Sequence, residues 1–304
     1  MFKRVRSVVA AIIGTSLLLT ACSSEEKETK NNAKATNKNE TKQSIHLPYI
    51  AEIPTMDVTK ATDSESMNVM RNVFEGLYIL GEDNKVIPGV AKSYEVSDDK
   101  KTYTFHLRDS KWSNGTPVTA ADFVYSWKRA VNPDTAAEYA FLFFDIKNAK
   151  RINSKELPID QLGVKAIDDK TLEVQLEQPV PYFINLTTFA TFLPINEQYF
   201  ESQGTQYGLE ASQLVYNGAF TLDNWKHEQG FQLKKNSNYW DTKTVKLDEI
   251  NFDIVKDKST EINLYEAGQI DRVGLTGEFV DKYRNSSDFK ERPEVTMQFL
   301  RMNQ

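Results

Sequence analysis

The sequence predicts an α/β protein. Residues 103–107 alternate apolar and polar side chains, as a half-buried strand does, and residues 119–131 carry apolar side chains at helical spacing. Alternating segments recur at residues 164–176 and 250–254, with helical segments between them. Strand and helix patterns therefore interleave along the chain, which is typical of the α/β class.

The segment from Thr102 to Val131 has the clearest local signals. A strand ending near Leu107 is followed by the turn residues 113–117, which contain Asn, Gly and Pro. Thr119 then fits a helix N-cap, and Asp122 stands where a capping-box carboxylate would. Strand, turn and helix signals agree here, so we expect a fixed structural unit.

The first 22 residues have the pattern of an export signal. A basic segment at residues 3–6 precedes an apolar run at residues 8–19, which is too short for a conventional membrane span. Leu19-Thr20-Ala21-Cys22 resembles the lipobox of bacterial lipoprotein signals. A plain signal peptide needs only a small residue near its cleavage site. The Cys directly after Leu-Thr-Ala favours lipidation of Cys22.

Residues 23–44 are dominated by Glu, Lys, Asn and Thr, with no aromatic or branched aliphatic side chain. Such a segment cannot bury enough apolar surface to offset its ordering entropy, so a flexible tether is expected. A lipid at Cys22 followed by a tether predicts a protein anchored on the outer face of the cell membrane. The Lys/Asn-rich composition is typical of a Gram-positive lipoprotein.

The first part of the body predicts a strand, a loop and a helix. Residues 45–49 form the strand and residues 52–57 the loop, after which Asp63 or Ser64 can cap the helix. The apolar helix face is predicted to contain Met67, Met70, Val73, Phe74 and Leu77. Asn132-Pro133-Asp134 stops the later helix, and an aromatic run follows at residues 136–144.

The second part of the body predicts more strands. Asp168-Asp169 turns a hairpin, and Asn217-Gly218 forms a turn leading into a strand at Phe220. The remaining expected elements are strands at 231–234 and 250–254, a helix at 261–267 that ends at Gly268, and a strand beginning at 268–271.

Composition excludes several classes of function. The formal net charge is −6, or −9 without the three cations at residues 3–6, and no basic stripe suggests a nucleic-acid partner. A single Cys cannot form an internal disulfide or a thiolate cluster. His46, His106 and His227 lack metal-ligand spacing, and no nucleophile elbow or P-loop is present. We therefore predict no catalytic residue, no metal, no cofactor and no enzymatic activity.

Residues 112–127 read WSNGTPVTAADFVYSW, which resembles the signature of the bacterial extracellular solute-binding proteins of family 5. The resemblance extends from Ile45 to Gln304 but covers only the first part of a family member. It implies a periplasmic-binding-protein-like fold of class II (cluster C) with two lobes and mixed sheets, here with the second lobe largely missing. The implied organisation is a signal peptide at 1–21, lipidated Cys and tether at 22–44, the start of lobe I at 45–75, an accessory domain with lobe I elements at 76–215, a return to lobe I at 216–270, and the start of a truncated lobe II at 271–304.

The resemblance also implies ligand contacts. Tyr139 matches a ligand-contacting position outright, although an aromatic packed on an apolar helix is an equal reading of the residues alone. Thr62, Asp63 and Ser64 match a loop that makes strand-like contacts to the ligand backbone, but a carboxylate found there in relatives is Thr62 here. Thr276 lies in a segment that departs from the Asn-rich pattern of relatives.

The implied function is to capture oligopeptides outside the cell for the membrane subunits of an ABC peptide importer. The segment 185–214 and the run Tyr-Asn-Gly-Ala-Phe resemble the oligopeptide branch rather than dipeptide or nickel binders. The family's acidic anchor for the ligand's α-ammonium group belongs to the later lobe, so we expect this 304-residue, monomeric chain to bind peptides weakly or not at all. The alternatives are a peptide-pheromone receptor on the same scaffold and a truncated surface lipoprotein without transport activity.

Overall fold

The computed structural model of the chain describes residues 42–291 and Met302. Contacts divide the chain into Met1–Thr41 and Lys42–Gln304, and the fold is that of the second unit. The predicted export signal, Cys22 and most of the tether lie outside the described residues, as do residues 292–301. The fold of the described residues contains two four-stranded sheets and one short hairpin.

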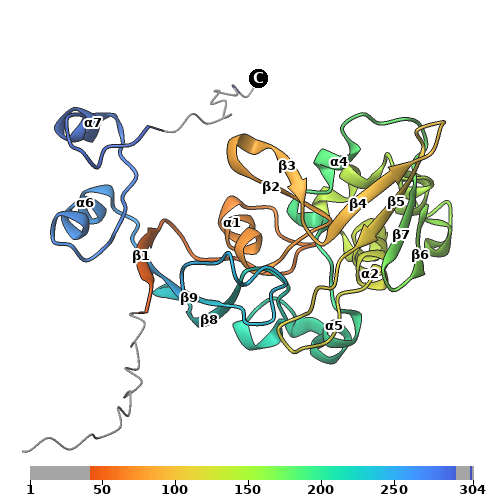
Figure 1. Cartoon of the computed structure of the whole chain (residues 1–304), viewed down its shortest axis with the longest axis horizontal. Helices are drawn as coiled ribbons and strands as arrows, with labels where there is room; N and C mark the ends of the chain where they lie inside the picture. The colour runs from red at the N-terminus through yellow and green to blue at the C-terminus, as the bar shows by residue number, and fades with distance from the viewer. Residues whose placement is uncertain (1–41, 292–301, 303–304) are drawn as a thin grey trace, which may run out of the picture. The chain divides into compact units, whose positions relative to one another are not determined.

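The first sheet is mixed and has the strand order β1-β10-β9-β8 (Figure 1). Its strands are β1 (Ser44–Tyr49), β8 (Phe220–Lys226), β9 (Gly230–Lys235) and β10 (Glu249–Ile254). β1 pairs in parallel with β10, and the other pairs are antiparallel. The predicted strands at 45–49, 231–234 and 250–254 are confirmed. Helix α1 (Ser64–Val73) packs against β8 of this sheet.

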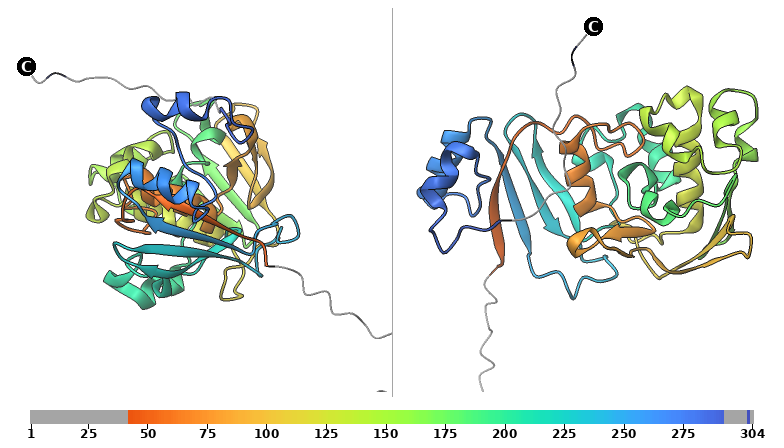
Figure 2. Two further views of the ribbon diagram at one scale, coloured as in Figure 1. Left: turned by 90° about the vertical axis from the view of Figure 1, so that its left-hand side faces the viewer. Right: turned by 90° about the horizontal axis from the view of Figure 1, so that it is seen from above.

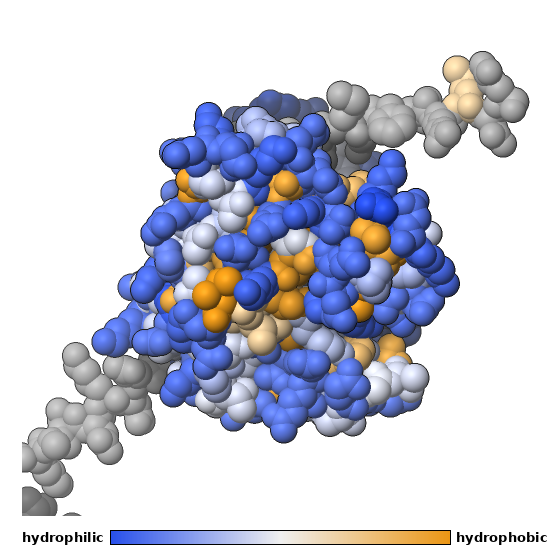
Figure 3. Space-filling view, turned by 90° about the vertical axis from the view of Figure 1, so that its right-hand side faces the viewer, coloured by the Kyte–Doolittle hydropathy of each residue, from blue (hydrophilic) through white to orange (hydrophobic). Residues whose placement is uncertain are grey.

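The second sheet is antiparallel, with the strand order β4-β5-β7-β6. It is formed by β4 (Ala91–Val96), β5 (Thr102–Leu107), β6 (Val164–Asp168) and β7 (Thr171–Gln175). Helix α2 (Ala120–Val131) packs against β6 and β7. The surface seen from this end of the molecule is mostly hydrophilic, with apolar side chains gathered near its middle (Figure 3).

The segment 102–131 folds as predicted. The side chains of β5 alternate between half-buried and buried positions, and Gly115 in the following turn has a φ of +88°, which glycine adopts without strain. The carboxylate of Asp122 accepts a hydrogen bond from the backbone N–H of Thr119 at 2.8 Å. Trp127 is fully buried and packs against Phe192. Residues 102–131 therefore have a structural role in the core of this part of the fold.

The hairpin of β2 (Tyr78–Leu80) and β3 (Val86–Pro88), like β4, is not predicted by the sequence patterns. Both strands of the hairpin have three residues, too few to show a period, and β4 is exposed along all but its first residue. The remaining α-helices of the described residues are α3 (Ala149–Asn153), α4 (Phe183–Leu186), α5 (Glu197–Gln203), α6 (Lys258–Glu266) and α7 (Gly277–Tyr283). The 3-10 helices are Glu82–Asn84, Pro133–Thr135, Glu138–Phe143, Ile159–Gln161, Ala190–Phe192, Gly204–Gln206 and Ala211–Gln213.

Two expectations from the sequence are wrong. Phe74 and Leu77 are buried but do not belong to the helix, because α1 ends at Val73 and Phe74 is extended. Residues 268–271 form no strand; instead, Asp271 alone contacts the edge of β1. Its backbone N–H donates to the carbonyl of His46 at 2.8 Å, and its carboxylate accepts from the N–H of His46 at 2.7 Å. Two hydrogen bonds to one residue of β1 are thus formed here instead of the hydrogen bonds of a paired strand.

The chain joins the two sheets through two adjacent crossings, at Glu75 and at Asn217. The side-chain amide of Asn217 accepts from the backbone N–H of Glu75 at 3.0 Å and donates to its carbonyl at 2.8 Å. The N–H of Gly218 donates to the carbonyl of Val73 at 2.9 Å. A Cβ at Gly218 would lie 2.6 Å from the carbonyl carbon of Val73, so glycine is required here for close approach rather than for positive φ.

The carboxylate of Glu75 is buried at the same junction. It accepts hydrogen bonds from the hydroxyl of Tyr239 at 2.5 Å and from the indole N–H of Trp240 at 2.7 Å, while the guanidinium of Arg108 stacks on Trp240. Burial raises the pKa of Glu75 from 4.5 to about 7, against the lowering effect of these two hydrogen bonds. These side chains hold the loop at residues 236–241 against the crossing at Glu75, and the side-chain amide of Asn236 donates to the carbonyl of Gly218 at the other crossing.

Replacing Glu75 by Gln should change how stability depends on pH. Because the pKa of Glu75 is raised in the folded protein, the folded state keeps a proton that the unfolded state releases above about pH 4.5. The free energy of unfolding of the wild type should therefore fall, relative to Glu75→Gln, by up to about 3 kcal/mol between pH 5 and pH 8. Urea denaturation across this range measures it.

Glu82→Gln provides the control, since Glu82 is exposed and lies in the 3-10 helix between β2 and β3. Its difference from the wild type should stay nearly constant with pH. A constant difference for Glu75→Gln as well would contradict a raised pKa at Glu75.

Candidate functional site

Tyr139 lies in a cluster of exposed and half-buried aromatic rings beside the start of α1. Its ring contacts Phe141 at a centroid distance of 5.9 Å and Phe189 at 5.2 Å, and its hydroxyl donates to the carbonyl of Thr62 at 3.5 Å. Phe141 is 55% exposed. We call Thr62, Tyr139, Phe141 and Phe189 the Tyr139 cluster. Tyr139 thus both packs on neighbouring rings and stays partly accessible, which leaves both of its predicted roles open.

The backbone at Thr62, Asp63 and Ser64 has N–H groups without intramolecular acceptors in the described residues. Asp63 is extended, with φ −106° and ψ 156°, and its carboxylate caps α1 by accepting from the N–H of Ser66 at 2.7 Å. The N–H groups of Thr62 and Asp63 donate to no acceptor among residues 42–291. Ser64 begins the helix, where N–H groups lack an intrahelical acceptor. An extended ligand backbone could accept these bonds.

The loop that leads to these residues is held by a buried ion pair. The guanidinium of Arg129 on α2 binds both carboxylate oxygens of Asp57, at 2.7 and 2.6 Å. Asp57 also accepts from the backbone N–H and the hydroxyl of Thr59. Removing one partner of such a pair typically costs about 3–5 kcal/mol because the other charge stays buried. The ion pair fixes the loop between the mixed sheet and α2.

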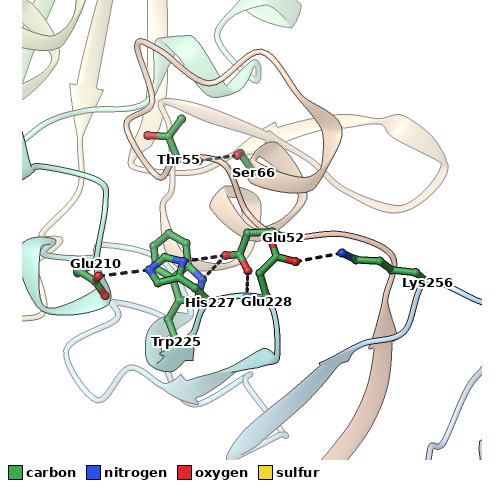
Figure 4. Close-up of polar contacts among 8 residues, drawn as sticks. All are labelled: Glu52, Thr55, Ser66, Glu210, Trp225, His227, Glu228 and Lys256. Atoms are coloured by element: carbon green, nitrogen blue, oxygen red, sulfur yellow. Dashed lines mark hydrogen bonds and ion pairs between the residues drawn. The ribbon is translucent and has the colours of Figure 1, made fainter.

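The start of the same loop is held by Glu52 (Figure 4). Its carboxylate accepts from the indole N–H of Trp225 at 2.8 Å, from the backbone N–H of Glu228, and lies 3.1 Å from Nδ1 of His227. Nε2 of His227 lies 3.3 Å from the carboxylate of Glu210. His227 therefore bridges two carboxylates from different segments.

The charges at this bridge shift both pKa values. Partial burial opposes ionisation, but hydrogen bonds to Glu52 and Glu210 and their charges raise the pKa of His227 above its ordinary value. At Glu52, burial acts to raise the pKa, and the hydrogen bonds from Glu228, Trp225 and His227 outweigh it, so the pKa is lowered. Both shifts favour the charged forms of His227 and Glu52, and therefore an ion pair at the start of the loop.

The structure brings Tyr139 and Thr62 together, with Asp63 and Ser64 next in the chain. Thr276 is exposed and precedes α7, which lies with α6 beyond the edge strand β1 and away from α2 (Figures 1 and 2). No hydrogen bond or ring contact joins Thr276 to the other four residues in the described part of the chain. Its predicted ligand contact stays a prediction, as does lipidation of Cys22.

Within residues 42–291, no cluster of His, Cys, Asp or Glu has the arrangement of a metal site. No helix in this part of the chain is long and apolar enough to cross a membrane. The Tyr139 cluster also holds no acid, base and nucleophile within reach of one another. What the arrangement offers is backbone N–H groups, aromatic surface and a fixed loop, which are the components of a binding site.

Sequence reasoning missed the residues that fix this loop. Asp57 and Arg129 are 72 positions apart, and Glu52 and His227 are 175 apart, so no local pattern links them. In the sequence, Phe189 is recognisable only as an apolar residue near a predicted helix, which does not indicate a contact with Tyr139. A signal existed for Phe141, which lies in the aromatic run with Tyr139.

Comparison with known proteins identifies the family of the chain. Residues 85–304 match the family model "Bacterial extracellular solute-binding proteins, family 5 Middle". The oligopeptide-binding protein OppA of Bacillus subtilis (strain 168) is 38% identical over 270 residues, covering 88% of this chain and 49% of that protein. Members of this family are solute-binding proteins rather than enzymes.

Two solved structures share the fold, each with a TM-score of 0.79. The substrate-binding domain of an oligopeptide ABC transporter from Bacillus anthracis str. Ames is 56% identical, with 81% of this chain and 48% of that chain covered. The pheromone receptor PrgZ is 40% identical, with 82% and 50% covered. The predicted α/β, periplasmic-binding-protein-like fold is confirmed.

The chain spans about half the length of the relatives that it matches. The family model nevertheless covers most of the chain, including the signature at residues 112–127 and the Tyr139 cluster from Tyr139 onward. This chain belongs to family 5 of the bacterial extracellular solute-binding proteins.

Proposed function

We propose that this protein captures oligopeptides outside the cell and presents them to the membrane subunits of an ABC transporter. The observation that carries this proposal is the backbone at Thr62 and Asp63, whose N–H groups have no acceptor in the described residues. Asp63 is extended, and the carbonyl of Thr62 accepts a hydrogen bond from Tyr139. Main-chain hydrogen bonds bind an extended peptide without reading its sequence, and aromatic surface accommodates varied side chains. The printed descriptions of the relatives, which include oligopeptide-binding proteins, agree with this proposal.

The fixed loop supports the same function. Glu52, Asp57 and Asp63 anchor its start, middle and end through charged or capping hydrogen bonds. A binding surface that is already ordered loses less conformational entropy when the ligand arrives. The ion pairs at Glu52 and Asp57 therefore favour binding by holding the loop that presents Thr62 and Asp63.

Alanine at Tyr139 should weaken peptide binding. Loss of an aromatic contact costs about 0.5–1.5 kcal/mol, which predicts a roughly two- to tenfold higher dissociation constant. NMR titration of the chain with a pool of short peptides measures this.

Tyr182→Ala is the matched control for Tyr139→Ala. Tyr182 is 54% exposed, and its hydroxyl donates to Asp145 at 3.3 Å. It makes no hydrogen bond or ring contact with the Tyr139 cluster in the described residues. Tyr182→Ala should bind peptides with the same affinity as the wild type. Equal weakening of peptide binding by both substitutions would argue against a ligand contact at Tyr139. Unchanged binding in both variants would do so as well.

We further propose that a lipid on Cys22 anchors the protein to the outer face of the membrane. The supporting pattern is Leu19-Thr20-Ala21-Cys22 behind an apolar run, followed by a polar segment. Cys22→Ser should release the protein into the medium and abolish incorporation of labelled palmitate. Ser23→Ala should leave both unchanged; palmitate incorporation into Cys22→Ser would refute the assignment.

A pheromone receptor is the second candidate, because PrgZ is among the solved structures that match at a TM-score of 0.79. Competition between hydrophobic signalling peptides and random peptides separates the two functions. Nutrient capture predicts similar affinity for both sets, whereas a receptor predicts clear preference for the signalling peptides. If deletion of the gene left growth on peptides unchanged, a surface lipoprotein without transport activity would be favoured.

A further inference from the structure

A cavity of about 340 Å³ lies between the end of α1, the β2–β3 hairpin and residues 188–193. Its size falls at the small end of the range for small-molecule sites in proteins. It is separate from the Tyr139 cluster, although residues 188–190 border both: Thr188 and Ala190 line the cavity, while Phe189 contacts Tyr139. The cavity therefore has its own wall residues.

Arg71 supplies the charge at this cavity. It lies in the last turn of α1, its side chain is exposed, and it makes no hydrogen bond, ion pair or ring contact with any described residue. A guanidinium presents paired N–H donors that match the two oxygens of a carboxylate. Arg108, the cation next to Glu75, is engaged: it donates to the carbonyl of Gly89 and stacks on Trp240.

The remaining walls are partly apolar and partly polar. Phe74 and Leu193 are buried and, with Ile79 and Ala219, provide apolar surface, while Asn84, Thr188 and Tyr239 are polar. Glu75 also faces the cavity, but its carboxylate already accepts hydrogen bonds from Tyr239 and Trp240. The cavity thus combines an unpaired cation with an apolar patch formed by Phe74, Ile79, Leu193 and Ala219.

We propose that this cavity binds a small carboxylate with an apolar body, in which Arg71 pairs with the carboxylate and Phe74 and Leu193 enclose the body. The site does not depend on the proposed peptide capture, because it shares none of the predicted peptide contacts. Two sources could supply this chemistry: a free acid of amino-acid size, or the carboxylate-bearing end of a peptide that also contacts Thr62. For the second source the peptide would need at least about four residues, since the eight steps from Asp63 to Arg71 rise about 12 Å along the helix.

The test uses N-acetyl-leucine, which carries the carboxylate, and N-acetyl-leucinamide, which does not. NMR titration of the chain should show binding of the acid at millimolar concentrations and little binding of the amide, and Trp240 fluorescence should report the same event through Glu75. Arg71→Ala should weaken binding of the acid by roughly tenfold or more, as expected for loss of a charge-assisted pair. Arg71→Lys should keep part of the affinity.

Arg272→Ala is the control, since Arg272 is also exposed and has no partner in the described residues. It should bind N-acetyl-leucine like the wild type. Equal affinity for acid and amide, or unchanged affinity in Arg71→Ala, would overturn the proposal, as would absence of binding by the acid. Such results would leave peptide binding at Tyr139 intact, because that is measured with Tyr139→Ala.

A leucine-ending tetrapeptide distinguishes the two sources. If the end of a peptide is the ligand, the tetrapeptide acid should bind more tightly than N-acetyl-leucine, and both Arg71→Ala and Tyr139→Ala should weaken it. If a free acid is the ligand, the tetrapeptide should bind no better and Tyr139→Ala should change nothing. Both patterns support a carboxylate site at Arg71.

Discussion

The hydrogen-bonded junction of Glu75 and Asn217 is the constraint on which the fold depends. The chain leaves the mixed sheet at the first residue and returns to it at the second, 142 positions later. The amide of Asn217 satisfies both backbone groups of Glu75, which would otherwise be buried without partners, and an unsatisfied group of this kind costs about 1–3 kcal/mol. The carboxylate of Glu75 adds Tyr239 and Trp240 to the same point. The two sheets are thereby fixed at both crossings.

The loop between Glu52 and Asp63 shows how this scaffold serves binding. Its polar anchors come from three different places: β8 and the residues after it, α2, and the first turn of α1. Because those elements are fixed by the sheets, the loop can hold an extended backbone with free N–H groups at the surface. Unpaired backbone N–H groups are unfavourable when they are buried. At the surface they can donate hydrogen bonds to an extended ligand.

Local structure could be predicted from the sequence where the signals were short-range. The turn at Gly115, the cap at Thr119 and the alternation in β5 all appear as expected, because each depends on residues within a few positions. The end of α1 could not be predicted, because Phe74 is extended to let Glu75 reach Asn217. The conformation at Asp271 likewise could not be predicted, because Asp271 contacts His46, which is 225 positions away in the sequence. The aromatic Tyr139 was found through resemblance, while Asp57–Arg129 and Glu52–His227 left no local signal.

The central claim is that Thr62, Asp63 and Tyr139 form one side of a peptide-binding surface. Hydrogen–deuterium exchange of the chain with and without a saturating pool of short peptides tests it directly. The account predicts slower exchange at the N–H groups of residues 62–64 and across residues 138–141, with β4 and β6 unchanged. Unchanged exchange at residues 62–64, while peptides slow exchange elsewhere, would contradict it.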